Sequence, residues 1–383
     1  WGDSDRMVVS WGGVVVAAAL SRKIDPDKLR FRLVGAHTDS PNLRIKPNPD
    51  VGHLGYQQLG VEVYGGALLN SWLDRELGLS GRVVVGDSAS HESHLIHIDK
   101  PLLRVAQLAI HLDRDVNDGL KLDRQAHLVP IWGLGETEEG AFRSFLATEL
   151  GVNDTEVLSW DMMCHDLTPS SPLGRNEEFY AAPRIDNLAS CHAALEALRD
   201  IESVASNTIS AVVLFDHEEI GSESSTGARG PMLSHALERI AGTRAVSREQ
   251  FLRSLSRSAC ISADGAHAVH PNYVDRHEPG HQVVLNGGPV IKLNANVRYA
   301  TDAESSAVAQ SACRSAGVPF QQYAHRSNLP CGSTIGPITA SQLGMLVVDI
   351  GSPQLSMHSA REMAGASDPA YLTAALKAFL SDG

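Results

Sequence analysis

Two long apolar runs in the sequence end abruptly in groups of polar residues. Residues 31–41 (FRLVGAHTDSP) and residues 210–222 (SAVVLFDHEEIGS) each begin with consecutive apolar side chains, many of them β-branched. Such runs are typical of strands that are buried on both faces of a parallel sheet. In open α/β sheets, ligands bind outside the carboxyl ends of the strands. His37, Glu218 and Glu219, which end or follow the two runs, therefore lie where we expect chemistry.

The C-terminal half alternates between helical periodicity and short apolar runs. We expect helices at 185–201 and 303–317, from Ser247 and from about residue 369, strands at 260–264 and 344–351, and a hairpin at 283–294 (VVLNGGPVIKLN). Ser247 is a residue type that commonly caps a helix N-terminus. This alternation predicts an α/β domain with a largely parallel sheet.

A different pattern fills the middle of the chain. Residues 42–174 contain short alternating stretches such as GVEVYGG and GRVVVGD, with many Gly, Pro and His residues. This pattern predicts a β-rich module whose clearest helix, at 141–151, stops at Gly151. We therefore predict an α/β catalytic domain made of residues 1–41 and 175–383, interrupted by an inserted domain at 42–174. A β-hairpin is expected at residues 7–20.

The composition limits the kinds of partner that we expect the protein to bind. The 383 residues include 32 basic and 45 acidic side chains, which give a formal net charge of −13. This charge, without any basic run, argues against nucleic acid and anionic membranes as partners. The five scattered cysteines form no C-x-x-C pair and indicate free thiols in a reducing compartment, so we expect a cytoplasmic protein. Because the first residue is Trp1, we expect the natural chain to begin earlier.

Side chains that can bind metals recur at or near the ends of the apolar runs. They are His37, Asp186, the pair Glu218 and Glu219, Asp264 and His358. Imidazole and carboxylate groups are the ligands that suit a zinc ion with an open coordination position. Two histidines and three carboxylates suffice for two metal ions about 3.5–4 Å apart, with one carboxylate bridging them. Asp39, two residues after His37, is placed to accept the ring N–H of that histidine.

Six motifs extend this pattern along the chain: AHTDSP, RIDNLAS, DHEEIGS, SADGAHAVHPNY, CGSTIGP and SMHSAREM occur in this order. Together with GVEVYGG, LAIHLDRDVN and HLVP in the middle segment, they resemble the M18 family of zinc metallopeptidases, which includes aspartyl aminopeptidase. The resemblance covers nearly the whole chain. It implies a zinc-exopeptidase fold, a three-layer α/β/α catalytic domain with an inserted β-rich dimerisation domain. It also implies a homo-oligomer, with a dimer as the minimal unit and a tetrahedral dodecamer as the full assembly.

The resemblance also implies roles for individual residues. It implies two zinc ions per subunit, with His37, Glu219, Asp264 and His358 as ligands, Asp186 as the bridging ligand and Glu218 as the general base. His267 and Tyr299 match positions that steady the tetrahedral intermediate, and Lys292 matches one that contacts an acidic substrate side chain. His111 matches a histidine that reaches the neighbouring subunit's site. The N-terminal stretch usual for the family is absent here, and His217 stands where another residue is common.

These residue types define a mechanism. A water that bridges two zinc ions has its pKa lowered towards roughly 7. Glu218 accepts the water's proton and later delivers it to the leaving amine. An aminopeptidase also binds the free α-amine of its substrate, and the sequence leaves open whether a carboxylate or a metal does so.

The predicted function is therefore a dinuclear zinc aminopeptidase, a hydrolase that removes an N-terminal Asp or Glu from peptides. Three alternatives stay open. The first is an M18-like aminopeptidase that prefers neutral residues, and the second is a related metal-dependent deacylase or carboxypeptidase. The third is an inactive assembly protein, which is disfavoured because Glu218 and every matched ligand are present.

Overall fold

The computed structural model describes residues 5–381, which divide into two compact units. The first unit comprises residues 5–40, 171–357 and 362–381, and the second comprises residues 41–170 and 358–361. The sequence placed the insert at 42–174, and it gave no sign that the short segment 358–361 belongs with the second unit. Among the described residues, no helix combines the length and the apolar character needed to cross a membrane.

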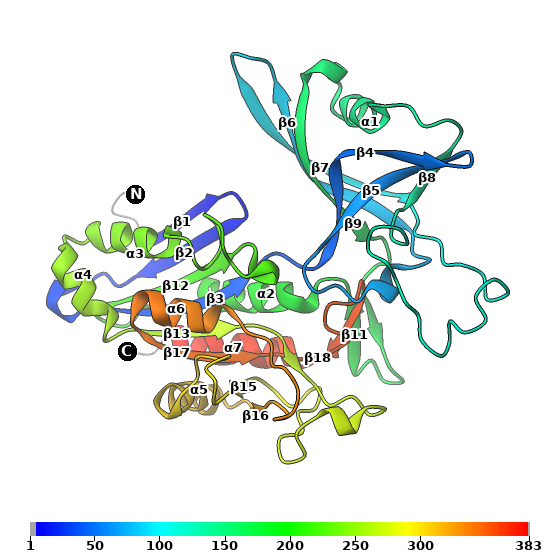
Figure 1. Cartoon of the computed structure of the whole chain (residues 1–383). Coiled ribbons are helices and arrows are strands. Elements are labelled where there is room, and N and C mark those ends of the chain that lie inside the picture. Colours follow the sequence, from blue (N-terminus) through cyan, green and yellow to red (C-terminus); the bar gives the residue numbers. More distant parts are fainter. Residues whose placement is uncertain (1–4, 382–383) are drawn as a thin grey trace. The chain divides into compact units, whose positions relative to one another are not determined.

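An eight-stranded sheet forms the centre of the first unit (Figure 1). In spatial order its strands are β1 (Arg6–Trp11), β2 (Val14–Leu20), β12 (Thr208–Phe215), β3 (Arg30–His37), β13 (Ala259–Ala263), β17 (Leu346–Gly351), β15 (Val290–Leu293) and β16 (Gln321–Ala324). The four strands β12, β3, β13 and β17 run parallel to one another. All residues of β12 are buried, as its continuous apolar run predicts. The β1–β2 hairpin confirms the prediction for residues 7–20.

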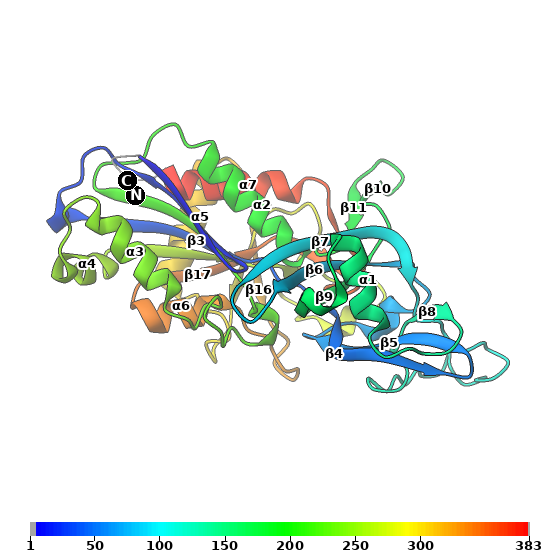
Figure 2. The same ribbon diagram turned by 90° about the horizontal axis from the view of Figure 1, so that it is seen from above.

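Helices cover both faces of this sheet. The helices α2 (Ile185–Arg199), α5 (Ala303–Ser315) and α7 (Asp368–Ser381) pack on one face, and α3 (Met232–Gly242), α4 (Arg248–Leu255) and α6 (Ile335–Leu343) pack on the other. A hydrophobic core lies on each face of the sheet, and alternate residues of β3 belong to the two cores. Leu33 faces α3, α4 and α6, whereas Val34 faces α2, α5 and α7. Figure 2 shows the sheet between these two sets of helices. This arrangement confirms the predicted three-layer α/β/α fold class.

A smaller sheet completes the first unit. Its five strands, in spatial order, are β10 (Ser171–Leu173), β11 (Phe179–Ala182), β19 (Glu362–Gly365), β18 (Pro353–Leu355) and β14 (Ala266–His267). Its strand β14 begins shortly after β13 ends. The chain therefore passes from the carboxyl edge of the large sheet directly into the small sheet.

The second unit is β-rich, as its alternating sequence predicts. Its antiparallel sheet contains, in spatial order, β7 (His91–Leu103), β6 (Leu77–Gly86), β9 (Val157–Asp166), β4 (Asn42–His53), β5 (Tyr56–Tyr64) and β8 (Ile131–Leu134). The helix α1 (Ala141–Leu150) packs on it through Phe142 and Leu146. Gly151 ends α1 in the left-handed region at φ 70°, which confirms the predicted stop.

Several elements differ from the sequence prediction. The hairpin expected at 283–294 is wrong, because only β15 forms there and it pairs with β16 and β17. The backbone N–H groups of Asn286 and Gly288 donate to the carboxylate of Asp368 instead of to a neighbouring strand. The helices α3 and α6 were not predicted. Short 3-10 turns in the described residues lie at Pro26–Lys28, Leu69–Trp72, Asp154–Glu156, Glu218–Ile220 and Val274–Arg276.

Candidate active site

The carboxyl ends of three adjacent strands bring most of the predicted ligands together. His37 is the last residue of β3, where it pairs with Phe215 of β12, and Asp264 directly follows β13. Glu218 and Glu219 open the short turn that follows β12. Because β12, β3 and β13 are parallel neighbours, their polar ends meet at one edge of the sheet. Asp186 reaches the same place from the first turn of α2.

The buried imidazole of His37 lies at the centre of this group. Its Nε2 atom is 3.3 Å from Asp264 Oδ1, 3.4 Å from Asp186 Oδ1 and 4.0 Å from Glu218 Oε2. The ligand atoms of His37, Glu218 and Glu219 lie within 4.8 Å of one another, and those of His37, Asp186 and Asp264 do so as well. Five of the six predicted metal-site residues are therefore neighbours in the first unit.

Asp39 connects the two glutamates to the histidine. His37 Nδ1 lies 3.0 Å from the main-chain oxygen of Asp39 and 3.4 Å from its carboxylate. The same carboxylate accepts the backbone N–H groups of Glu218 at 3.0 Å and of Glu219 at 3.1 Å. The sequence predicted that Asp39 orients the ring of His37. The structure adds that it holds the turn from which both glutamates project.

Two residues that the sequence did not single out hold Asp186. The hydroxyl of Ser40 donates to the main-chain oxygen of Asp186 at 2.7 Å, and the carboxylate of Glu362 accepts its backbone N–H at 2.9 Å. Glu362 is 2% exposed. A buried acid is costly unless its oxygens find donors, and this one follows the quoted SMHSAREM motif's His358 by only four residues. Its position in that motif was the feature of the sequence that could have identified Glu362 as part of the site.

The electrostatics of the group favour a bound cation. Burial lowers the pKa of His37, but hydrogen bonds with Asp186, Asp264 and Asp39 outweigh it and raise that pKa well above its usual value. Burial raises the pKa of Glu218 to about 8; His37 opposes this rise, and the charges of Asp264 and Asp186 add to it. So many acidic groups around one imidazole require compensating positive charge. Imidazole nitrogen and carboxylate oxygen are zinc ligands, so these residues fit a zinc site.

His358 belongs to the second unit, and its contacts within that unit are as follows. Its Nδ1 atom lies 3.2 Å from the main-chain oxygen of Gly66, and its own main-chain oxygen accepts the N–H of Leu68. The residue has a positive φ of 68°. Its role as a sixth metal-site residue stays a prediction.

Lys292 places a buried positive charge beside Asp264. The side chain is 2% exposed, and Nζ donates to the main-chain oxygens of Asp264 and Gly265, both at 3.1 Å. Nζ also lies 3.7 Å from the Asp264 carboxylate and 5.1 Å from the ring centroid of Tyr299. A lysine on a short strand would usually face solvent. Its burial here, with both hydrogen bonds made to main-chain oxygens beside Asp264, is therefore unusual.

The two predicted oxyanion donors have different environments. Tyr299 is 5% exposed, and burial raises the pKa of its hydroxyl, with Cys331 adding to the effect. The hydroxyl therefore keeps its proton and can act as a donor. His267 is exposed at the end of β14, with its ring centroid 6.2 Å from that of Tyr323. The ring of Tyr323 lies 6.4 Å from that of Tyr299.

Asp349, which sequence reasoning missed, fixes the loop that carries Tyr299. This fully buried residue of β17 accepts hydrogen bonds from the hydroxyls of Ser262 and Thr334 and from the backbone N–H of Ala300, each at 2.6 Å. Burial raises the pKa of Asp349. Thr334 also caps α6, so part of the CGSTIGP motif forms the start of that helix.

The surroundings of His217 and His111 differ from each other. His217 turns its Nδ1 atom to the hydroxyl of Ser224, 2.8 Å away. His111 lies in the second unit, where LAIHLDRDVN forms an exposed loop. Leu108, Ile110 and Leu112 are 57%, 45% and 74% exposed.

Comparison with known proteins decides the family. The family described as Aminopeptidase I zinc metalloprotease (M18) matches residues 4–380. The chain belongs to the M18 family. It is 51% identical over 373 residues to a probable M18 family aminopeptidase 2 of Streptomyces avermitilis, an alignment that covers 96% of this chain and 85% of the relative.

Solved structures of M18 proteins share the fold. The Ape4 protein in its complex with Nbr1 aligns with a TM-score of 0.92 at 36% identity, covering 98% of this chain and 76% of that one. The mApe1 dodecamer of S. cerevisiae aligns with a TM-score of 0.83 at 26% identity, covering 99% and 86%. This M18 protein is a metallo-aminopeptidase, and the family match supports zinc as its metal.

Proposed function

We propose that this M18 aminopeptidase binds two zinc ions per subunit and releases N-terminal Asp or Glu from peptides. The observation that carries the proposal is the buried cluster around His37, in which Asp186, Asp264 and Glu218 all approach Nε2 within 4.0 Å. His37, Asp186, Glu219, Asp264 and His358 would hold the metals, with Asp186 bridging. Zinc bound there would act as a Lewis acid on the scissile carbonyl and on the attacking water.

The residues of the chain supply the proton transfers. Glu218 accepts a proton from the attacking water and passes it to the leaving amine. Its partly exposed carboxylate and its backbone N–H bond to Asp39 keep it at the rim of the buried group. The Tyr299 hydroxyl and the His267 ring are the proposed donors to the oxyanion that develops on the substrate.

Lys292 supports a preference for acidic residues. It places a buried ammonium beside Asp264, where a substrate carboxylate could exchange for one of its present oxygen partners. A hydrogen bond to a charged group is worth roughly 1.5–3 kcal/mol, or about one to two decades in rate. The alternatives, an M18-like aminopeptidase for neutral residues and a deacylase or carboxypeptidase, would not need this lysine for selectivity.

The test measures release of Asp, Glu and Leu from matched short peptides, by the wild type and by Lys292→Met. We expect the wild type to prefer Asp and Glu, to lose activity on chelation and to regain it when zinc is added back. Lys292→Met should lower kcat/KM for Asp and Glu peptides by about one to two decades and for the Leu peptide much less. Lys377→Met, an exposed lysine of α7, is the matched control and should change none of these rates.

Two results would count against this assignment. Equal losses on all three peptides would make Lys292 a positioning residue for Asp264 alone. A wild-type preference for Leu would remove the acidic selectivity and favour the neutral-residue alternative, while metal-dependent release would still hold.

We propose further that the enzyme is a homo-oligomer in which His111 completes a neighbour's site, with the dimer as the smallest active unit. Exposed leucine and isoleucine side chains around His111 are typical of a surface covered by a partner. The mApe1 structure of S. cerevisiae is a dodecamer. We propose that this chain also assembles into a dodecamer, with tetrahedral symmetry. A cytoplasmic location stays a prediction.

Mixing two inactive variants tests the shared site. Glu218→Gln lacks the base and His111→Phe lacks the proposed partner contribution. After dissociation and reassembly together, a mixed dimer has one pocket with Glu218 and an incoming His111, so up to half of the sites in mixed dimers should recover. Each variant reassembled alone is the control. No recovery although hybrids form, or full activity of His111→Phe alone, would exclude the shared site.

A further inference from the structure

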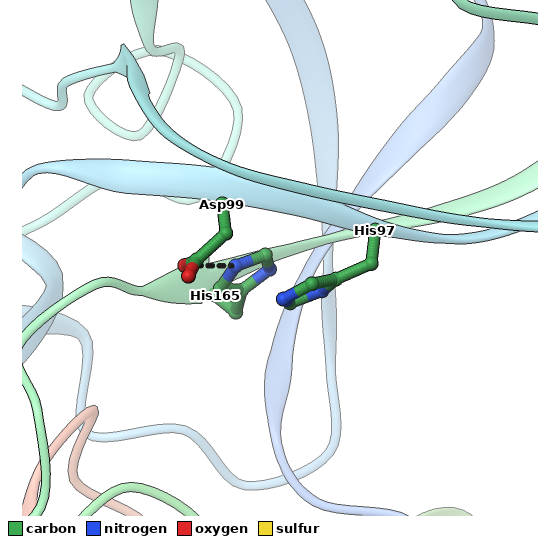
Figure 3. Close-up of side chains that lie close together, drawn as sticks. All are labelled: His97, Asp99 and His165. Atoms are coloured by element: carbon green, nitrogen blue, oxygen red, sulfur yellow. Dashed lines mark ion pairs between the residues drawn. The ribbon is translucent and has the colours of Figure 1, made fainter.

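A second group of metal-ligating side chains lies in the β-rich unit, outside the peptidase site. It consists of His97 and Asp99 on β7 and His165 on β9, and their ligand atoms all lie within 4.8 Å of one another. Figure 3 shows the three side chains pointing toward one another. All three belong to the second unit. None of the three residues was predicted from the sequence as a metal ligand, so this group is a finding of the structure.

Strand register puts the three side chains on one face of the sheet. On β6, Leu79 pairs with Ile98 of β7 and with Cys164 of β9, and all three are buried in the core of this unit. Side chains alternate between faces along a strand. The neighbours His97, Asp99 and His165 therefore lie on the face opposite to that core.

A glycine on the strand between them allows the approach. Gly78 of β6 pairs with His165, and a Cβ atom at this position would lie only 2.7 Å from His165 Nε2. The absence of a side chain there leaves room for the imidazole of His165 to lie across β6 toward β7. Its ring stacks on that of His97 with centroids 4.9 Å apart and planes 17° apart, and its Nε2 atom is 3.9 Å from Asp99 Oδ1.

Burial and charge around the group also suit a cation. His165 is 6% exposed, which holds its ring in place, whereas the Asp99 side chain is 70% exposed and gives access from solvent. Lys100, the nearest positive charge along β7, pairs with Glu149 at 3.0 Å. Its charge is therefore engaged elsewhere. Two imidazoles and one carboxylate with open positions form the ligand set of many zinc sites.

We propose that His97, Asp99 and His165 form a second binding site for a divalent transition-metal ion such as Zn²⁺, separate from the peptidase centre. Water would fill the remaining coordination positions. The bound ion would connect β7 to β9, the two strands on either side of β6. The proposal is independent of how many metal ions the peptidase centre holds, because it concerns one additional ion per chain.

Zinc counting in the full-length, metal-stripped protein tests the site. A Zn²⁺ titration against a chromophoric chelator should give one equivalent per chain fewer for His97→Ala than for the wild type. Asp99→Asn should weaken the same equivalent by at least the ~10-fold that changes around metal ligands typically cause. Both residues are exposed, so these variants are expected to fold. His94→Ala is the matched control, since His94 lies on the same strand but pairs with Glu92 at 2.7 Å. It should bind as much zinc as the wild type.

A second measurement uses the unaltered chain. Labelling of histidines with diethylpyrocarbonate, read by peptide mass spectrometry, should show that Zn²⁺ protects His97 and leaves His94 reactive. Equal zinc content in His97→Ala and wild type would overturn the proposal, and so would unchanged labelling of His97 on addition of zinc.

Discussion

Glu218→Gln is expected to retain its zinc and to lose almost all peptidase activity. The amide keeps the shape of the side chain but cannot accept a proton, whereas general acid–base assistance contributes about 10²–10⁴-fold to a rate. The proposed ligands Glu219, Asp186 and Asp264 are unchanged in this variant. We therefore expect a fall in kcat at least as large as that range, measured on the preferred peptide, together with wild-type zinc content by elemental analysis.

Glu223→Gln is the matched control for this prediction. Glu223 follows the same turn, but its side chain is 79% exposed and pairs with Arg229 at 3.6 Å, so its loss should leave kcat near the wild-type value. Near-normal turnover in Glu218→Gln at full zinc occupancy would show that another group serves as the base.

Asp186→Asn is expected to lose metal as well as activity. A neutral amide in the proposed bridging position would neutralise less positive charge and would bind both of the proposed ions more weakly. Zinc content after dialysis should therefore fall below that of Glu218→Gln, and excess zinc should restore part of the activity. The contrast between the two variants separates a metal ligand from a base.

Asp200→Asn, at the other end of α2, controls for changes to that helix. Asp200 is a surface residue that pairs with Arg199 at 2.9 Å, so this variant should keep its zinc and its activity. Two tightly held zinc ions per chain in Asp186→Asn would contradict the bridging role.

The strand ends could be predicted from the sequence because one local signal marks them. An apolar run that stops at a ligand-type side chain indicated His37, Glu218 and Asp264 without any knowledge of which strands are neighbours. The structure then places β12, β3 and β13 side by side. The hairpin predicted at 283–294 is wrong because no local pattern shows where the backbone N–H groups of this segment bond. They donate to Asp368, which lies far along the chain at the start of α7.

Supporting residues are harder to predict than ligands. Asp349 lies inside an apolar strand, and Glu362 lies in a motif whose histidine attracts attention first. Their importance depends on long-range hydrogen bonds to Ser262, Thr334 and Asp186, which no local pattern contains. The same holds for His165, which meets His97 because Gly78 leaves space between their strands.

The position of β3 in the large sheet has a consequence for synthesis on the ribosome. β3 is made before residues 41–170, yet both of its neighbours, β12 and β13, are made after them. Domains generally fold as units during translation, so we expect the sheet of the second unit to form while β3 still waits for its partners. His37 then meets Glu218 and Asp264 only when most of the chain has emerged. The nascent protein is therefore expected to stay without peptidase activity until translation is nearly complete.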